Sequence, residues 1–266
     1  SSSEPLRIQS LLPPVPPVSL PPFIIHIRSD SSKAKLSEII IQETGMSSSL
    51  VDELLRFGAV YTCPAQDLED RQSSPIKAVR TMQDIELIPG SYVRVHAQPK
   101  RFLTVYKMDW NARVICESED FIVINKPPGV PSLTTIDNAI ECVMSQVEKI
   151  KNISLMPTSR LDVCTAGVLI FAKTREFCMS TNKAMSERRS EKIYKLLSEG
   201  EVQTGTVRHL FCRKRKGHKN SRPTLLRAWQ DLTSRKDLQE EGWQDAVLEI
   251  LDCRPFMLEE EGKKRE

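Results

Sequence analysis

The uninterrupted apolar run Phe121-Ile122-Val123-Ile124 constrains the fold more than any other feature of this chain. Four consecutive apolar residues without polar alternation are typical of a β-strand that is buried on both faces. The run leads into residues 125–132, which contain three prolines and a glycine and are expected to form a rigid loop. A strand of this kind needs a layer on each side, so we expect a sheet covered by helices.

A domain of α+β class is predicted over about residues 105–254. Strands are expected to start at residue 114 and to cover residues 121–124, 169–172, 192–197 and 246–251. Asp137 is expected to cap a helix, and a polar helix is expected over residues 175–189. The stripe of the first helix consists of Ile140, Val143, Val147 and Ile150. Because strands outnumber helices, we predict a mixed sheet.

A smaller α/β domain is predicted over residues 33–100, in the N-terminal half of the chain. Two short helices are expected, ending at Gly45 and Gly58, with an N-cap for the second at residues 47–49. Their predicted buried stripes are Leu36, Ile39 and Ile40 in the first, and Leu50, Leu54 and Leu55 in the second. Strands are expected at residues 59–61 and 92–97, the latter with Val93 and Val95 inward, and residues 62–88 are expected to be an insertion.

Residues 1–32 are expected to be an extended Pro/Ser-rich leader or linker. Seven prolines among the first 28 residues argue against a helix or a strand. The start at Ser1 indicates a processed or incomplete N-terminus, and Glu4 is the only acid before residue 29. An acid-poor leader with serines is typical of import into a chloroplast or mitochondrion, but the usual arginines are missing, so both interpretations stay open.

Composition places the chain among soluble intracellular proteins. No apolar run approaches the roughly 20 residues that a membrane-spanning helix needs. Seven scattered cysteines without a Cys-x-x-Cys pair are typical of reduced thiols. The net charge is only +3, yet residues 202–230 carry eight Lys or Arg and no acid. Such a stripe predicts attraction to a polyanion, the alternative being a solvated loop.

The triplet Arg160-Leu161-Asp162 is the strongest candidate for a catalytic element. It is followed by Thr165 and Gly167 and lies directly before the apolar run at residues 169–172. An aspartate on a turn at the mouth of a buried strand is held rigidly and still open to a ligand. The alternative for this short motif alone is a surface ion pair between Asp162 and a neighbouring arginine.

Three segments, in this order, resemble the catalytic domain of the RluA-type RNA pseudouridine synthases, including plant or organellar members. They are residues 119–129, ending in Asn-Lys-Pro-Pro-Gly, residues 159–167 with Arg-Leu-Asp, and residues 192–197, Lys-Ile-Tyr-Lys-Leu-Leu. The resemblance covers about half of the chain. It implies a largely antiparallel pseudouridine synthase sheet flanked by helices, and isomerisation of uridine to pseudouridine in RNA. The helix-helix-strand order of residues 33–100 resembles an S4-type RNA-binding module, although only Arg56 is basic on its second helix.

The resemblance also implies roles for individual residues. Asp162 would supply the nucleophile or charge stabiliser at a flipped-out uridine, and Tyr194 would lie against the base and aid proton transfer. Arg160, Lys126 and Thr165 would contact the RNA or its phosphates, and so would Arg213, Lys214, Arg215 and Lys216. The structural alternatives are a core tyrosine for Tyr194, a carboxylate partner for Arg160 and a structural role for Lys126. No metal or cofactor is expected, the partner is RNA (rRNA or tRNA), not DNA or membrane, and a monomer is expected.

The chain departs from the family pattern in two places. Ser159 stands where the family usually has His or Asn, and nothing after residue 251 matches the family's later strand, Gly-Arg-x-His-Gln-Ile-Arg. We therefore expect a truncated C-terminus, with residues 255–266 as a charged disordered tail. The alternative function is an RNA-binding protein that keeps the synthase fold but has impaired catalysis.

Overall fold

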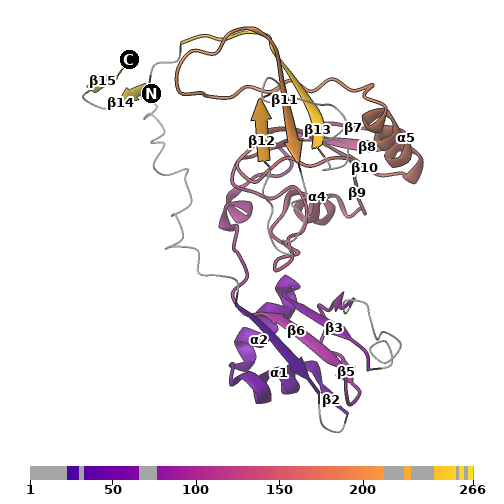
Figure 1. Cartoon of the computed structure of the whole chain (residues 1–266). Coiled ribbons are helices and arrows are strands. Elements are labelled where there is room, and N and C mark those ends of the chain that lie inside the picture. Colours follow the sequence, from indigo (N-terminus) through magenta and orange to yellow (C-terminus); the bar gives the residue numbers. More distant parts are fainter. Residues whose placement is uncertain are drawn as a thin grey trace, which may run out of the picture. The chain divides into compact units, whose positions relative to one another are not determined.

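The computed structural model describes residues 23–29, 33–65, 77–212, 225–228, 243–255, 258–260 and 263–265 (Figure 1). The chain divides into two compact units, Ser1–Ser190 and Glu191–Glu266. The first unit contains an N-terminal module and a second layered part, each with its own apolar core. The architecture is mixed α+β with antiparallel sheets, as the sequence predicts.

Two helices of the N-terminal module begin and end where the local sequence dictates. Helix α1 spans Leu36–Thr44 and helix α2 spans Ser48–Phe57. Gly45 and Gly58 both adopt the left-handed conformation, with φ of 70° and 67°, and so terminate the helices. Ser47 caps α2 by accepting a hydrogen bond from the amide of Leu50. One predicted core position is wrong, because Leu50 is exposed and Val51 is buried in its place.

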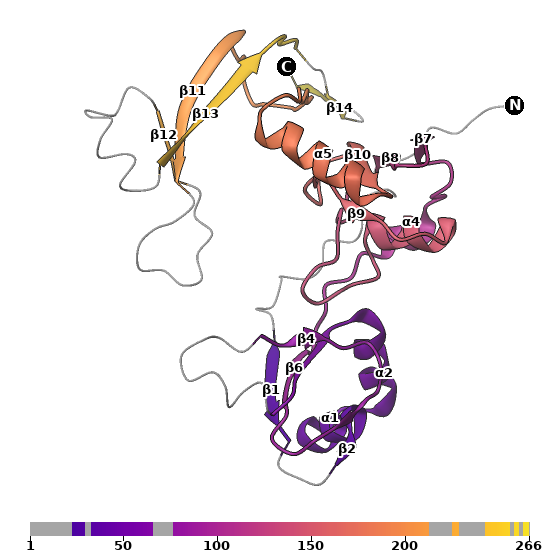
Figure 2. The same cartoon turned by 90° about the vertical axis from the view of Figure 1, so that its right-hand side faces the viewer.

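The two helices cover one face of a four-stranded sheet (Figure 2). The strands are β1 (Ile24–Arg28), β6 (Tyr92–His96), β3 (Val60–Cys63) and β4 (Val79–Arg80), in that order across the sheet. A separate ladder joins β2 (Ala34–Lys35) to β5 (Glu86–Leu87). Val93 and Val95 point into the core beneath α1 and α2 and are fully buried, as predicted.

Strand β1 corrects the prediction of a leader over residues 1–32. It pairs antiparallel with β6 along its whole length, from Ile24 opposite His96 to Arg28 opposite Tyr92. The prolines that argue against regular structure end at Pro22, so all five residues of β1 have an amide hydrogen for pairing. Within the predicted insertion 62–88, strands β4 and β5 belong to the module itself.

The second part of the first unit is built on the sheet β7-β8-β10-β9. The strands are β7 (Val114–Glu117), β8 (Phe121–Lys126), β10 (Gly167–Ala172) and β9 (Met156–Pro157), and all their pairings are antiparallel. The helical elements are a 3-10 helix, Leu103–Lys107, and the helices α4 (Val143–Lys151) and α5 (Arg175–Ser186). Ile122, Val123 and Ile124 are buried, which confirms β8 as an interior strand.

Helix α4 begins later than the sequence predicts. The expected cap, Asp137, instead accepts hydrogen bonds from the amide of Lys100 and the hydroxyl of Thr135. The side chain of Asn138 accepts from the amides of Ile140 and Glu141, which closes a turn in front of the helix. Regular helix therefore starts only at Val143, and Ile150 at its far end is exposed.

The strand predicted at residues 192–197 is not formed. This segment has no regular structure, and its apolar side chains Ile193, Tyr194, Leu196 and Leu197 are exposed. An alternating pattern makes a strand only when a neighbouring strand accepts and donates its backbone hydrogen bonds, and none pairs with this segment within the described residues.

The second unit contains the three-stranded sheet β12-β11-β13. Its strands are β11 (Gly205–Cys212), β12 (Leu225–Ala228) and β13 (Trp243–Ile250). Strand β13 contains most of the strand predicted at residues 246–251. In the tail that the sequence predicts to be disordered, β14 (Leu258–Glu260) pairs antiparallel with β15 (Lys263–Arg265). Among the described helices, none combines the length and the apolar character needed to cross a bilayer.

Candidate active site at the Asp162 turn

Asp162 lies on a tight turn between the short strand β9 and the buried strand β10. The amide of Thr165 donates to the carbonyl of Asp162 over 3.1 Å, which closes the turn. The side chain of Asp162 is exposed. Within the described part of the chain, it forms no ion pair, so the interpretation of Arg160 and Asp162 as a structural surface pair has no support there. The carboxylate is therefore open to a ligand.

Lys126 anchors the turn from beneath. It is the last residue of β8, lies opposite Gly167 of β10 and is fully buried. Its Nζ donates to the carbonyls of Thr165 over 2.7 Å, Pro127 over 3.0 Å and Val163 over 3.3 Å. Because two of these acceptors follow Asp162 in the chain, the lysine fixes the C-terminal side of the turn.

The loop after β8 fixes the other side. The hydroxyl of Ser132 accepts from the amide of Leu161 over 2.9 Å and donates to its carbonyl over 2.7 Å. The amide of Gly129 donates to the carbonyl of Val163 over 2.7 Å, with Gly129 in the left-handed conformation at φ 80°. The backbone on both sides of Asp162 is thus held by residues about thirty positions earlier in the chain.

Burial lowers the pKa of Lys126 to about 8, and nearby Cys164 and Asp162 oppose that shift. The protonated amine has three hydrogens for its three carbonyl acceptors, whereas the neutral amine has two. The full set of hydrogen bonds that anchors the turn therefore requires the charged lysine.

The structure brings together four of the predicted site residues, Lys126, Arg160, Asp162 and Thr165. Arg160 is exposed on the same turn as Asp162, and half-buried Thr165 contributes through its backbone to the Lys126 contact. Tyr194 belongs to the second unit and is 57% exposed on the segment without regular structure, so the predicted active-site strand that would carry it is not present. The predicted basic residues 213–216 lie outside the described residues.

Sequence reasoning missed Ser132 and Gly129 as residues that hold the turn. The available signal was the rigid loop at residues 125–132, which follows a central strand in a place where loops often form sites. What the sequence does not contain is the pairing of that loop with residues 161–165.

Residues 120–251 match the model of the family described as RNA pseudouridylate synthase. The matched segment includes Lys126, Ser132, Asp162 and Tyr194. Just under half of the chain is therefore similar to this family, and residues 120–251 are called the synthase-family domain below.

Proteins with similar sequences have related descriptions. RNA pseudouridine synthase 6, chloroplastic, from Arabidopsis thaliana is 27% identical over 91% of this chain and 55% of its own length, and the protein of that name from Oryza sativa subsp. japonica is 28% identical over 91% and 54%. An uncharacterized RNA pseudouridine synthase of Aquifex aeolicus is 29% identical over 72% of the chain and 62% of its own length. The chain thus spans about half the length of the two plant proteins.

Two solved human structures show only distant likeness. Human RNA Pseudouridylate Synthase Domain Containing 4 aligns with 55% of the chain and 54% of its own at 17% identity and a TM-score of 0.33. Human RNA Pseudouridylate Synthase Domain Containing 1 aligns with 39% of the chain and 34% of its own at 21% identity and a TM-score of 0.24. Both scores are too low for the superpositions to define equivalent side chains.

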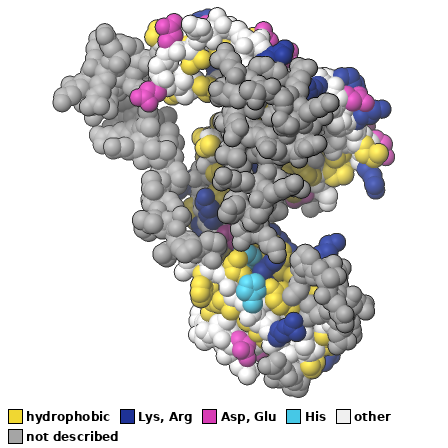
Figure 3. Space-filling model, in the orientation of Figure 1, with side chains coloured by type: hydrophobic (Ala, Val, Ile, Leu, Met, Phe, Trp, Pro, Cys, Tyr) yellow, Lys and Arg dark blue, Asp and Glu magenta, His cyan; other side chains and the backbone are white. Residues whose placement is uncertain are grey.

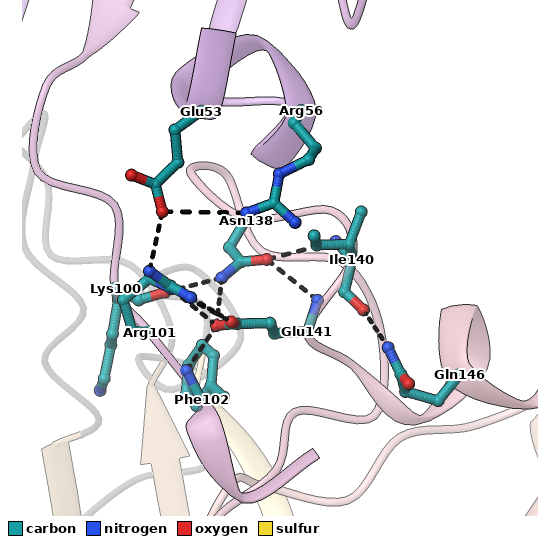
Figure 4. A network of polar contacts seen from close by, with 9 residues as sticks. All are labelled: Glu53, Arg56, Lys100, Arg101, Phe102, Asn138, Ile140, Glu141 and Gln146. Atoms are coloured by element: carbon teal, nitrogen blue, oxygen red, sulfur yellow. Dashed lines mark hydrogen bonds and ion pairs between the residues drawn. The ribbon is translucent and has the colours of Figure 1, made fainter. Parts of the chain in front are cut away.

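A polar network joins the synthase-family domain to the N-terminal module (Figure 4). Its centre is Glu141, whose fully buried carboxylate accepts from the guanidinium of Arg101, the amide of Phe102 and the side-chain amide of Asn138. Arg101 also forms an ion pair with Glu53 on α2 over 3.2 Å. The amide of Ala139 donates to the carbonyl of Phe57 at the end of α2. The stretch before α4 is thereby fixed against the module.

Proposed function

We propose that this chain isomerises uridine to pseudouridine in RNA, with Asp162 as the reacting carboxylate. The observation that carries the proposal is the Asp162 turn, which lies within the segment that matches the synthase family and is fixed on both sides while its carboxylate stays exposed. A carboxylate held by tertiary contacts and open to a ligand suits a reaction that depends on positioning.

The proposed isomerisation requires base flipping, cleavage of the glycosidic bond and formation of a carbon–carbon bond. A paired uridine must leave its helix, at a cost of a few kcal/mol, before a side chain can reach it. Its glycosidic bond must then be broken, the base rotated and a carbon–carbon bond formed to the same ribose. Asp162 supplies the negative charge that attacks or stabilises the ribose or base during this exchange. The overall change is redox neutral, since the product is an isomer of the substrate.

Neighbouring residues have supporting roles in this proposal. Arg160, exposed beside Asp162, contacts a phosphate or fills the space left by the flipped base, where a planar guanidinium can both stack and donate. The amine of Lys126 holds the turn through backbone carbonyls, including that of Thr165, and the side chain of Thr165 would contact the RNA. Tyr194 would lie against the flipped base and aid proton transfer.

Two wider aspects also remain proposals. The N-terminal module would be an S4-like RNA-binding module, supported by its helix-helix-strand order and its caps. An organellar location, in a chloroplast, is supported by the chloroplastic descriptions of the two plant relatives. The RNA would be a ribosomal or transfer RNA.

The experiment is quantitative mapping of pseudouridine in total RNA incubated with the purified chain and with Asp162→Asn. This substitution keeps the size of the side chain and removes its charge. Conversion is expected with the wild type and is expected to fall below detection in the variant. Asp52→Asn, an exposed aspartate on α2, is the matched control and is expected to convert RNA as the wild type does.

The result that contradicts the proposal is equal conversion by the wild type and Asp162→Asn. RNA binding by the wild type without any conversion would instead support the alternative, a synthase fold with impaired catalysis.

A further inference from the structure

The face of the N-terminal sheet that α1 and α2 leave uncovered carries a row of cationic and aromatic residues. Register places His26 of β1 opposite Arg94 of β6, Arg94 opposite Tyr61 of β3, and Tyr61 opposite Arg80 of β4. Directly paired residues of neighbouring strands point to the same face, so one row crosses all four strands. The opposite face carries Val93 and Val95, which belong to the core under the helices.

The row is tied together by its rings and guanidinium groups. The guanidinium carbon of Arg94 lies 4.5 Å from the centre of the Tyr61 ring, and that of Arg80 lies 5.2 Å from it. Nδ1 of His26 is hydrogen-bonded to the hydroxyl of Tyr92 over 2.6 Å. The ring of His96 packs edge-on against Tyr61 at 5.7 Å between centres. Histidine and basic side chains also lie beside apolar ones on the surface of the module (Figure 3).

The charged side chains of the four strands are all basic, while the carboxylate of Asp137 lies near His96 and opposes the lowering of its pKa by burial. The four strands contain Arg28, Arg80, Arg94, His26 and His96 and no aspartate or glutamate. Arg80 is occupied, since it donates to the carbonyls of Gly58 and Thr135. Within the described residues, Arg28 and Arg94 form no ion pair. The positive charge that this face offers to a ligand is therefore that of Arg28 and Arg94.

Two buried donor or acceptor atoms on this face also have no partner. Nε2 of His96, a residue that is 4% exposed, and Nε of Arg94 make no hydrogen bond within the described part of the chain. Both atoms are shielded from solvent, so the donors that a ligand on this face can reach belong to the half-buried side chain of Arg94 and the exposed side chains of Arg28 and His26.

We propose that the accessible side chains of this row and its neighbour, His26, Arg28 and Arg94, bind the sugar-phosphate backbone of a single RNA strand. Arginine donors suit phosphate oxygens, and Tyr61 and Tyr92 are too buried for bases to stack on them. Binding therefore reads the backbone and not the base sequence. This surface differs from the second helix, where the S4 resemblance places basic residues and where α2 carries only Arg56.

The short chain segment between the row and the Asp162 turn gives this surface a role in holding RNA near the candidate active site. This step rests on the proposed function. Residues 132–136 contact both sites. Ser132 holds Leu161 beside Asp162, while the carbonyls of Thr135 and Ile136 accept hydrogen bonds from Arg80 and Tyr61. Three residues span at most about 11 Å. A strand bound along the row therefore has its neighbouring nucleotides within reach of the Asp162 turn.

The test is a binding titration of the full chain with a fluorescein-labelled oligoadenylate of about 12 nucleotides, a length in the range of single-strand sites. This probe has no uridine, so its affinity does not depend on catalysis. The double variant Arg28→Gln/Arg94→Gln is expected to bind roughly tenfold more weakly near 0.15 M salt. Its log-log salt dependence is expected to become shallower by about 1.4, because each lost phosphate contact removes about 0.7.

The control is Lys33→Gln/Lys35→Gln, which removes the same charge from exposed positions of the same module outside the row. It is expected to change the affinity by less than about twofold. Equal weakening by both double variants, or none by the first, overturns the proposal. So does equally tight binding of a polyglutamate peptide of the same length, since it would show attraction to any polyanion.

Substitution at Arg94 alters a partly buried side chain, so the single variant Arg28→Gln at an exposed position supports the result without that complication. It is expected to keep the wild-type melting temperature and to flatten the salt dependence by about 0.7. On a uridine-containing RNA, the double variant is expected to raise KM and leave kcat unchanged. Asp162→Asn is expected to bind the oligoadenylate normally. If the wild type converts no uridine while the oligoadenylate results hold, the proposed function fails and this surface stands.

Discussion

Arg101 donates through Nε and Nη2 to the carboxylate of Glu141, over 3.0 Å and 2.8 Å to the same oxygen, and thereby joins the N-terminal module to the synthase-family domain (Figure 4). The two ends of this pair differ in environment, because Glu141 is fully buried and Arg101 remains partly exposed. Arg101 also pairs with exposed Glu53. The same guanidinium thus pairs with one buried and one exposed carboxylate, so the contributions of the two ion pairs to stability can be compared directly.

Glu141→Gln is expected to destabilise the first unit by about 3 kcal/mol, because it removes the charge of a buried group with several donors around it. Glu53→Gln breaks an ion pair of the same arginine at the surface and is expected to cost less than about 1 kcal/mol. Urea unfolding followed by tryptophan fluorescence measures both. Equal costs for the two variants would show that the buried carboxylate has no special role.

Stability should also depend on pH through Glu141. Burial raises its pKa, but the hydrogen bonds from Arg101, the Phe102 amide and Asn138 outweigh burial and leave the pKa below 4.5. A carboxyl group with a lowered pKa in the folded state stabilises the protein above its unfolded pKa, and this contribution is lost as the pH falls through the folded value. The free energy of unfolding is therefore expected to fall below about pH 4.5. The fall should be smaller in Glu141→Gln, and identical profiles would contradict the assignment.

Lys126→Met is expected to lower kcat by roughly 100-fold, because misplacement of a reacting group by about 1 Å has effects of that size. The variant removes three hydrogen bonds to the backbone around Asp162 and leaves the carboxylate itself in place. Lys149→Met, at an exposed position of α4, is the matched control and should retain wild-type kcat. An unchanged kcat in the first variant would mean that the turn holds its shape without the lysine.

Activity is expected to decline above about pH 8 in the wild type. The pKa of Lys126 is lowered to about 8, so above that pH the amine is increasingly neutral and has one hydrogen too few for its three acceptors. Below that pH the amine is charged and the turn is fully anchored. The pH profile of kcat for pseudouridine formation measures the effect, and in Lys126→Met the alkaline limb near pH 8 should be absent. Persistence of that limb would assign it to another group.

The parts of the fold that follow from near neighbours could be predicted from the sequence. Gly45, Gly58 and Ser47 determine the backbone conformation of the turns in which they lie, so the local sequence predicts where α1 ends and where α2 begins and ends. The uninterrupted run in β8 and the alternation in β6 are likewise local patterns. Even here, Leu50 and Val51 are adjacent, and only the contact of α2 with the sheet decides that the valine is the buried one.

Features that depend on distant partners could not be predicted in the same way. Asp137 is a residue type that commonly caps helices, but in this fold its carboxylate accepts a hydrogen bond from the amide of Lys100, 37 residues earlier in the chain. Residues 192–197 have the alternation of a strand, but no strand in the described part of the chain pairs with them. At the candidate site, Asp162 was identifiable from its motif, whereas the contacts of Lys126 and Ser132 join positions 29 to 39 residues apart and have no local signature.

The anchoring of the Asp162 turn by main-chain atoms has a consequence for sequence variation. Lys126 and Gly129 bind the carbonyls of Val163 and Thr165, and Ser132 binds the amide and carbonyl of Leu161. Every residue type has a backbone carbonyl, and the side chains at positions 163 and 164 are exposed. Substitutions at these two positions should therefore preserve the contacts that hold the turn. The constraint falls instead on 126, 129 and 132, and a chain that lost one of these could keep its aspartate motif intact and still lose the geometry that makes it useful.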